Sequence, residues 1–177
     1  AYPRGEHKGI DIVSGDGVSN PQIIALTDGV VINDPVTNLP ECAEGKSKRG
    51  GFTHNGQEAW MDVNSGIHYN EGYGNHIIVN HNGYITTYAH LKSIPSALKK
   101  GSVITAGQTL GIMGNTGNST GTHLHIDIKL ESTGRYINPA ELLDSANAGK
   151  MENSGTSSID FADIRIVPKT DKGDDIV

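Results

Sequence analysis

Short runs of apolar or alternating residues recur along the chain, and Gly, Asn, Asp and Pro separate them. Alternation over about four to eight residues is typical of half-buried β-strands, and the separating residues are typical of turns. We therefore predict an all-β domain of antiparallel strands with little helix. The predicted strands are Ile10–Val13, Gln22–Thr27, Gly29–Asn33, His76–Asn80, Tyr84–Ala89, Thr109–Gly114 and His123–Leu130.

Local signals mark one hairpin and two helical segments. Asn82 and Gly83 stand between two predicted strands, and both central positions of a two-residue hairpin turn favour positive φ, which these residue types tolerate. The flanking strands should therefore pair antiparallel. Helical signals are few: Pro95–Lys100 is long enough for one turn, and Asn138 is a candidate N-cap for a helix over Pro139–Leu143.

The alternating pattern fails in two parts of the chain. Between about residues 34 and 74 a long polar stretch interrupts it, and we predict an insertion loop there. Loops of this length are often functional, so we expect this one to take part in substrate selection. The chain thus divides into a domain over residues 1–144 and a linker and tail over 145–177, with one strand-like piece at Ile159–Val167.

Composition narrows the class of protein. The chain has 177 residues, enough for one domain with a core, and its 23 Gly against 7 Pro suit many turns. A formal net charge of −6 argues against binding of nucleic acid, which needs clustered Lys and Arg. The single cysteine, Cys42, cannot form an intrachain disulfide. No apolar run is long enough to span a membrane and no segment of the sequence resembles a signal peptide, so we expect a domain excised from a longer protein.

Two histidines one residue apart stand in the last long predicted strand. Successive side chains of a strand point to opposite faces, so His123 and His125 share one face and Leu124 lies on the other, toward the core. Near the start of the chain, His7 and Asp11 are four residues apart and lie on one side of a strand. Two histidines and one carboxylate are ordinary zinc ligands, and they leave a fourth position for water, as in catalytic zinc sites.

Three motifs follow one another along the chain: His7-x-x-x-Asp11, Tyr88-Ala89-His90-Leu91, and a glycine-rich run from Gly114 that ends in His123-Leu124-His125. In this order they resemble the lysostaphin/LytM-type zinc metalloendopeptidases, which cut peptides of bacterial peptidoglycan. The likeness covers about residues 2–143, apart from the insertion. It implies a fold of the duplicated hybrid motif type, in which antiparallel sheets form a substrate groove.

The resemblance implies a role for five side chains. His7, Asp11 and His125 would hold one zinc ion per chain, and His90 and His123 would be catalytic. An imidazole titrates in the same range as a zinc-bound water, so the two can exchange protons. The implied function is hydrolysis of peptide bonds in the cross-bridges or stem peptides of peptidoglycan. We expect a monomer that works outside the cytoplasm, either secreted to the cell wall or carried as an endolysin by a phage or prophage particle.

Two other functions remain open at this stage. A non-catalytic relative that binds the wall or activates wall hydrolases would have lost ligands, whereas this chain keeps all five side chains. A histidine phosphocarrier of related fold needs no carboxylate ligand, so Asp11 argues against it.

The remaining histidines are expected to be surface or packing residues. These are His54, His68, His76 and His81, of which His81 should be exposed beside the hairpin. A second zinc site at His54 and His68 is the alternative for that pair.

Several further side chains are singled out by their type or their position beside the motifs. Asp127 should face the same way as His125 and orient a ligand histidine. Tyr2 is a possible carbonyl-polarising group by the same resemblance, and Cys42 is expected to be an ordinary loop thiol. Three aromatic residues either line a substrate groove or pack the insertion against the domain; they are Trp60, Tyr69 and Tyr73.

Overall fold

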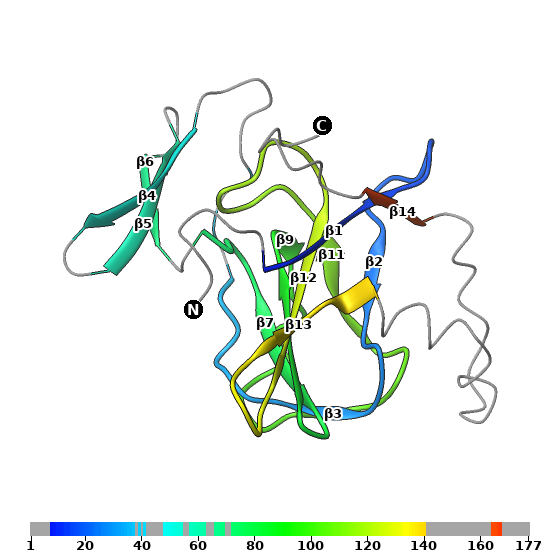
Figure 1. The fold of residues 1–177 in the computed structure, drawn as a ribbon. Helices are drawn as coiled ribbons and strands as arrows, with labels where there is room; N and C mark the ends of the chain where they lie inside the picture. Colours follow the sequence, from blue (N-terminus) through cyan, green and yellow to red (C-terminus); the bar gives the residue numbers. More distant parts are fainter. Residues whose placement is uncertain are drawn as a thin grey trace.

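The computed structural model describes residues 8–37, 39, 41, 48–54, 57–62, 66–69, 72–140 and 164–167. Within these residues helix is confined to Pro139 and Ala140, so the predicted all-β class is confirmed. The strands are drawn in Figure 1 and are, in chain order, β1 Gly9–Ser14, β2 Gln22–Ile24, β3 Gly29–Val31, β4 Lys48–His54, β5 Gln57–Asp62, β6 Gly66–Tyr69, β7 Ile77–His81, β8 Tyr84–Ala89, β9 Leu91–Ser93, β10 Val103–Ile104, β11 Thr109–Met113, β12 Leu124–Leu130, β13 Tyr136–Ile137 and β14 Ile164–Val167.

An eight-stranded sheet forms the main layer of the fold. Its order is β10-β3-β7-β8-β12-β1-β14, with β13 also paired to β12, and a three-stranded sheet of order β2-β11-β9 accompanies it. All pairings within these sheets are antiparallel. Strand β12 lies between β8 and β1, so its side chains are flanked by residues from both the middle and the beginning of the described chain.

The hydrophobic core contains residues from both of these sheets. As the alternation predicts, Leu124, Ile126 and Ile128 of β12 are buried in it, at 5%, 2% and 1% exposure. Full burial of an aliphatic side chain of this size contributes about 1.5–3 kcal/mol, so this face of β12 holds the strand firmly. The other members of the core are Ile12, Ile23, Ala25, Val31, Ile77, Val79, Tyr88, Leu91, Ile94, Leu98, Ile104, Leu110 and Met113.

The predicted hairpin and helix cap are confirmed. Asn82 and Gly83 have φ angles of 52° and 94°, and β7 pairs antiparallel with β8 across them. The Asn138 side chain accepts a hydrogen bond of 3.1 Å from the backbone N–H of Ala140, as an N-cap does, and the helical residues begin at Pro139. The remainder of the predicted helix lies outside the described residues.

The insertion contains regular structure that the sequence pattern did not predict. Strands β4, β5 and β6 form an antiparallel sheet of their own within residues 34–74. Where the insertion meets the domain, Val36 forms a bridge with His76. The backbone N–H of Leu39 donates to the Asn75 side chain at 2.9 Å, and the Asn75 amide donates back to the Leu39 carbonyl at 3.3 Å. The two ends of the insertion are therefore tied together at the domain.

The predicted strand-like piece near the end of the chain is in part a strand. Strand β14 pairs antiparallel with β1, with Ile12 opposite Ile166. This segment extends the main sheet beyond β1. Among the described residues no helix has the length and apolar character needed to cross a bilayer.

The prediction that His81 is exposed is wrong. His81 is buried, at 5% exposure, although it ends the strand beside the hairpin. Its Nδ1 lies 3.1 Å from the Asp28 carbonyl oxygen and its Nε2 lies 2.9 Å from the Tyr88 hydroxyl. Because a carbonyl only accepts, Nδ1 carries the proton and the neutral Nε2 accepts from the hydroxyl of Tyr88, which in turn accepts from the backbone N–H of Leu26 at 3.2 Å. Burial lowers the pKa of His81, which agrees with a neutral ring.

Candidate metal and proton-transfer site

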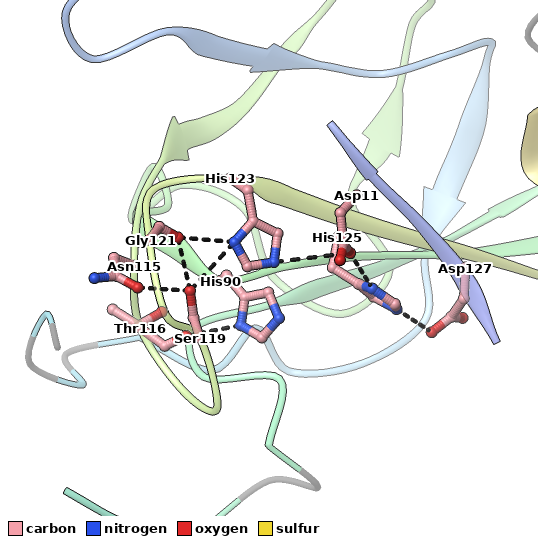
Figure 2. Close-up of polar contacts among 9 residues, drawn as sticks. All are labelled: Asp11, His90, Asn115, Thr116, Ser119, Gly121, His123, His125 and Asp127. Atoms are coloured by element: carbon pink, nitrogen blue, oxygen red, sulfur yellow. Dashed lines mark hydrogen bonds and ion pairs between the residues drawn. The ribbon is translucent and has the colours of Figure 1, made fainter. Parts of the chain in front are cut away.

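Sheet register brings the predicted site together. Asp11 of β1 is directly opposite His125 of β12, and His125 is in turn opposite Ala89 of β8. His90 follows Ala89 directly, and His123 precedes β12 in a bridge with Gly114. Figure 2 shows the side chains of Asp11, His90, His123 and His125 gathered over these strands. Of the five predicted site residues, four meet here and His7 lies outside the described residues.

Asp11 Oδ1 and His125 Nδ1 are the two atoms whose chemistry and separation best suit a metal ion. Asp11 Oδ1 lies 2.9 Å from His125 Nδ1. Two atoms that each bind one tetrahedral zinc at about 2.0–2.1 Å stand about 3.3 Å apart, so the observed separation is within a few tenths of an ångström of that value. Within the described part of the chain no group of three His, Cys, Asp or Glu side chains is arranged to hold a metal. The donor types and spacing of this pair fit zinc, with His7 as the predicted third ligand.

Gly9 leaves room for this pair. A Cβ atom at Gly9 would collide with the carbonyl oxygen of Ile126 and would lie 2.9 Å from Cε1 of His125. Real Cβ atoms essentially never come so close, so only glycine lets β1 approach β12 at this point. The glycine of the first motif is thus explained by the close approach of the two strands that carry Asp11 and His125.

The side of the His125 ring that faces away from Asp11 is held by the carboxylate of Asp127. Asp127 lies on the same face as His125, as predicted, and its Oδ2 is 3.4 Å from His125 Nε2. Asp127 is buried at 2% exposure and also accepts a hydrogen bond of 2.6 Å from the Tyr73 hydroxyl. Burial alone would raise the pKa of Asp127, but hydrogen bonds from His125, Tyr73 and Thr87 lower it, so the carboxylate stays ionised. Burial alone would likewise lower the pKa of His125, and its bonds to the two carboxylates raise it.

Backbone carbonyls assign the tautomers of both predicted catalytic histidines. His123 Nδ1 lies 2.8 Å from the Gly121 carbonyl oxygen, and His90 Nδ1 lies 2.7 Å from that of Thr116. Since a carbonyl only accepts, each Nδ1 carries a proton and each neutral ring keeps a lone pair on Nε2. His123 Nε2 is 3.7 Å from Asp11 Oδ1, and the two histidine rings lie 4.6 Å apart between centroids. Both imidazoles therefore carry their basic nitrogen at the site (Figure 2).

His90 is held in an unusual backbone conformation. Its φ of 60° falls in the left-handed region, which is rare for residues other than glycine and typical of functional sites. Its backbone N–H donates to the Tyr73 carbonyl at 2.8 Å, which together with the Thr116 contact fixes the residue. Burial, with the nearby rings of His123 and His125, holds the pKa of His90 well below its ordinary value, so it is a neutral base.

The glycine-rich run before β12 acts as a support for these rings. Thr116 is fully buried, and its hydroxyl donates to the Leu91 carbonyl at 2.8 Å and accepts from the backbone N–H of Asn75 at 3.0 Å. Gly117 packs so closely on Gly74 that a Cβ on either would collide with the backbone of the other segment. The run is therefore a turn structure that holds His90 and His123 through the carbonyls of Thr116 and Gly121.

Sequence reasoning did not find the supporting residues. Thr116 and Ser119 look like ordinary loop residues, yet the Ser119 hydroxyl lies 3.2 Å from His123 Nδ1 and 2.5 Å from Asn115 Oδ1. Tyr73 was expected to line a groove or pack the insertion, and its bond to Asp127 was not predicted. Only the position of these residues beside the motifs pointed to them. Tyr2 and Cys42 lie outside the described residues, as do the side chains of His54, His68, Trp60 and Tyr69.

Comparison with known proteins finds a family model that is similar to part of the chain. The model of Peptidase family M23 matches residues 62–139, which include His90, His123 and His125. The match agrees with the resemblance predicted from the motifs: residues 62–139, less than half of the chain, are similar to peptidase family M23.

The curated relatives also match only part of the chain. Peptidoglycan DD-endopeptidase ShyA of Vibrio cholerae is 42% identical over 66 residues, which are 37% of this chain and 14% of that protein. DD-carboxypeptidase/endopeptidase Mpg of Neisseria meningitidis is 40% identical over 72 residues, or 40% of this chain and 16% of that protein. An uncharacterised metalloprotease of Buchnera aphidicola is 44% identical over 70 residues, 39% of this chain and 18% of its own length. The match thus spans less than a fifth of each of these relatives.

Solved structures are similar at lower identity. Lysostaphin from Staphylococcus simulans is 22% identical with a TM-score of 0.49, covering 90% of this chain and 52% of its own. The catalytic domain of a prophage-encoded M23 protein from Enterococcus faecalis is 20% identical with a TM-score of 0.47, covering 79% of this chain and 81% of that domain.

Proposed function

We propose that this protein is a zinc-dependent endopeptidase that hydrolyses peptide bonds of bacterial peptidoglycan. One observation carries the proposal: the 2.9 Å approach of Asp11 Oδ1 to His125 Nδ1, with the Nε2 atom of His123 3.7 Å from the same carboxylate oxygen. This geometry supports a metal-binding pair with a base beside it in one small site. His7, Asp11 and His125 are the proposed ligands.

The chain's own residues supply positioning and proton transfer. A bound zinc ion would add Lewis-acid chemistry, polarising a scissile carbonyl and making a water molecule acidic enough to attack near neutral pH. His123 and His90 each present a neutral Nε2, which accepts a proton from the attacking water and returns one to the leaving amine. Their Nδ1 protons stay with the carbonyls of Gly121 and Thr116, so proton exchange takes place only at Nε2.

The names of the relatives suggest which bond to test first. ShyA is named as a DD-endopeptidase and Mpg as a DD-carboxypeptidase/endopeptidase. We therefore propose the D,D cross-link between stem peptides as the first candidate, with glycine cross-bridges as the comparison. Peptidoglycan lies outside the cytoplasmic membrane, so we also propose an extracytoplasmic site of action, secreted or carried on a phage or prophage particle.

Digestion of defined peptidoglycan tests the proposal directly. The 177-residue chain, loaded with one equivalent of zinc, should release peptides from D,D-cross-linked muropeptides that mass spectrometry identifies. Asp11→Ala should lose both zinc and hydrolysis, whereas His123→Ala should keep zinc and lose hydrolysis. Tyr84→Phe, a change at a 41% exposed side chain, is the matched control and should behave as wild type.

Two results would overturn the proposal. A wild-type chain that binds no zinc after equilibration excludes a metal mechanism. A chain that binds zinc and sediments with peptidoglycan but releases no peptide from any cross-link chemistry is instead a non-catalytic wall-binding relative.

A further inference from the structure

Tyr73 lies next to His125, one of the proposed metal ligands. Its ring centroid is 5.8 Å from that of His125 and 5.5 Å from that of His76, and its hydroxyl lies 2.6 Å from Asp127 Oδ2. A bond of this length from a hydroxyl to a carboxylate is a strong, charge-assisted one. The side chain therefore has a specific polar partner in addition to its ring contacts.

The oxygen that Tyr73 contacts is the one that faces the metal-ligand histidine. Asp127 Oδ2 is also the atom 3.4 Å from His125 Nε2. With Nδ1 of His125 turned toward Asp11, its Nε2 proton points to this oxygen (Figure 2). A carboxylate that receives the second N–H of a ligand histidine fixes the ring and its tautomer. The Tyr73 hydroxyl therefore anchors the atom on which the orientation of His125 depends.

The backbone around Tyr73 leaves the residue little freedom. Gly74, the next residue, has φ 64° and packs on the backbone of Thr116 and Gly117. The carbonyl of Tyr73 accepts from the His90 N–H at 2.8 Å. The backbone packing that holds His90 therefore also fixes the position of the Tyr73 side chain.

We propose that Tyr73 is a positioning residue that acts through Asp127 to hold the His125 ring in its metal-binding orientation. This inference rests on the proposed zinc site and adds a residue outside the predicted ligand and catalytic sets. Tyr73→Phe keeps the ring and removes only the hydroxyl, so it isolates the proposed contact. Tyr84→Phe makes the same chemical change at an exposed position and is the control.

Zinc affinity in a double-mutant cycle tests the proposal. Substitution of a direct partner of a ligand typically weakens metal binding by about 10- to 100-fold, so we expect this for Asp127→Asn and a smaller loss, about 3- to 10-fold, for Tyr73→Phe. Because Tyr73 acts through Asp127, the double variant should bind zinc no more weakly than Asp127→Asn alone. Unchanged affinity in Tyr73→Phe, or losses that multiply in the double variant, would overturn the proposal.

A second readout does not depend on zinc. In the metal-free protein, the ring ¹⁵N signals of His125, assigned by their loss in His125→Gln, should change in Tyr73→Phe and stay the same in Tyr84→Phe. Unchanged signals in Tyr73→Phe refute the positioning role even if the wild-type chain binds no metal. Failure of the wild type to bind zinc, with the signals changed as expected, counts against the proposed function alone.

Discussion

Removing the hydroxyl of Thr116 gives the sharpest test of how the glycine-rich run before β12 is held in place. In Thr116→Val the shape is nearly kept, but the buried N–H of Asn75 loses its acceptor at 3.0 Å and the Leu91 carbonyl loses its donor at 2.8 Å. Leaving a buried donor unpaired costs about 1–3 kcal/mol, and a lost hydrogen bond about 0.5–1.5 kcal/mol. We therefore expect Thr116→Val to lower the free energy of unfolding by about 2–4 kcal/mol.

Thr86 provides a matched control for the same chemical change. In the described part of the chain its hydroxyl is buried at 1% exposure and has no hydrogen-bond partner. Removing an unpaired buried hydroxyl relieves a desolvation cost, so Thr86→Val should be as stable as wild type or more stable by about 1 kcal/mol.

Urea unfolding, followed by circular dichroism, measures both variants. A loss of about 2–4 kcal/mol corresponds to a Tm lower by roughly 4–16 °C in a chain of this size. Zinc-dependent hydrolysis in Thr116→Val should fall further than stability alone explains, because the carbonyl that holds His90 Nδ1 belongs to the same residue. The reasoning is refuted if Thr116→Val and Thr86→Val prove equally stable.

Two further perturbations concern close packing and pH. Gly9→Ala should abolish zinc binding, measured by chelator competition, because the new Cβ collides with Ile126 and pushes on the His125 ring; near-normal affinity would show that the strands can separate there. The pKa of His81 is lowered in the folded state, so the unfolded chain binds a proton at this residue more readily than the folded chain does. The contribution of the neutral ring to stability is therefore fully present above the ordinary pKa of 6.5 and declines as the pH falls below it. Urea titrations between pH 8 and 5 should therefore show a slope of up to about 1.4 kcal/mol per pH unit that His81→Gln reduces, and an equal slope in that variant would assign the effect to other groups.

The parts of the fold that could be predicted from sequence are those set by local chemistry. The alternation of Leu124, Ile126 and Ile128 against His125 and Asp127 gives the orientation of β12 without any knowledge of its neighbours. The turn at Asn82 follows from its preference for positive φ in the same way. The three motifs then identify the side chains that gather at the site, although not the distances between them.

The parts that could not be predicted depend on partners far away in the chain. His81 is buried because Asp28, 53 residues earlier, offers a carbonyl to its ring, and no local pattern encodes that contact. Tyr73 reaches Asp127 across 54 residues for the same reason. The strands within the insertion pair only with one another in the described residues, so they need not show the apolar alternation that marks a face packed on the main core.

The pairing of β1 with β12 has a consequence for how the metal and the fold depend on each other. Asp11 and His125 are 114 residues apart in sequence and come within bonding distance only after the intervening strands have taken their places. An unfolded chain therefore offers no such pair, and an ion held between them at 100 times its dissociation constant would add about 2.7 kcal/mol to the stability of the native state. Bound zinc would therefore link two strands that are distant in sequence, so removing it with a chelator should lower the stability of the pairing between β1 and β12.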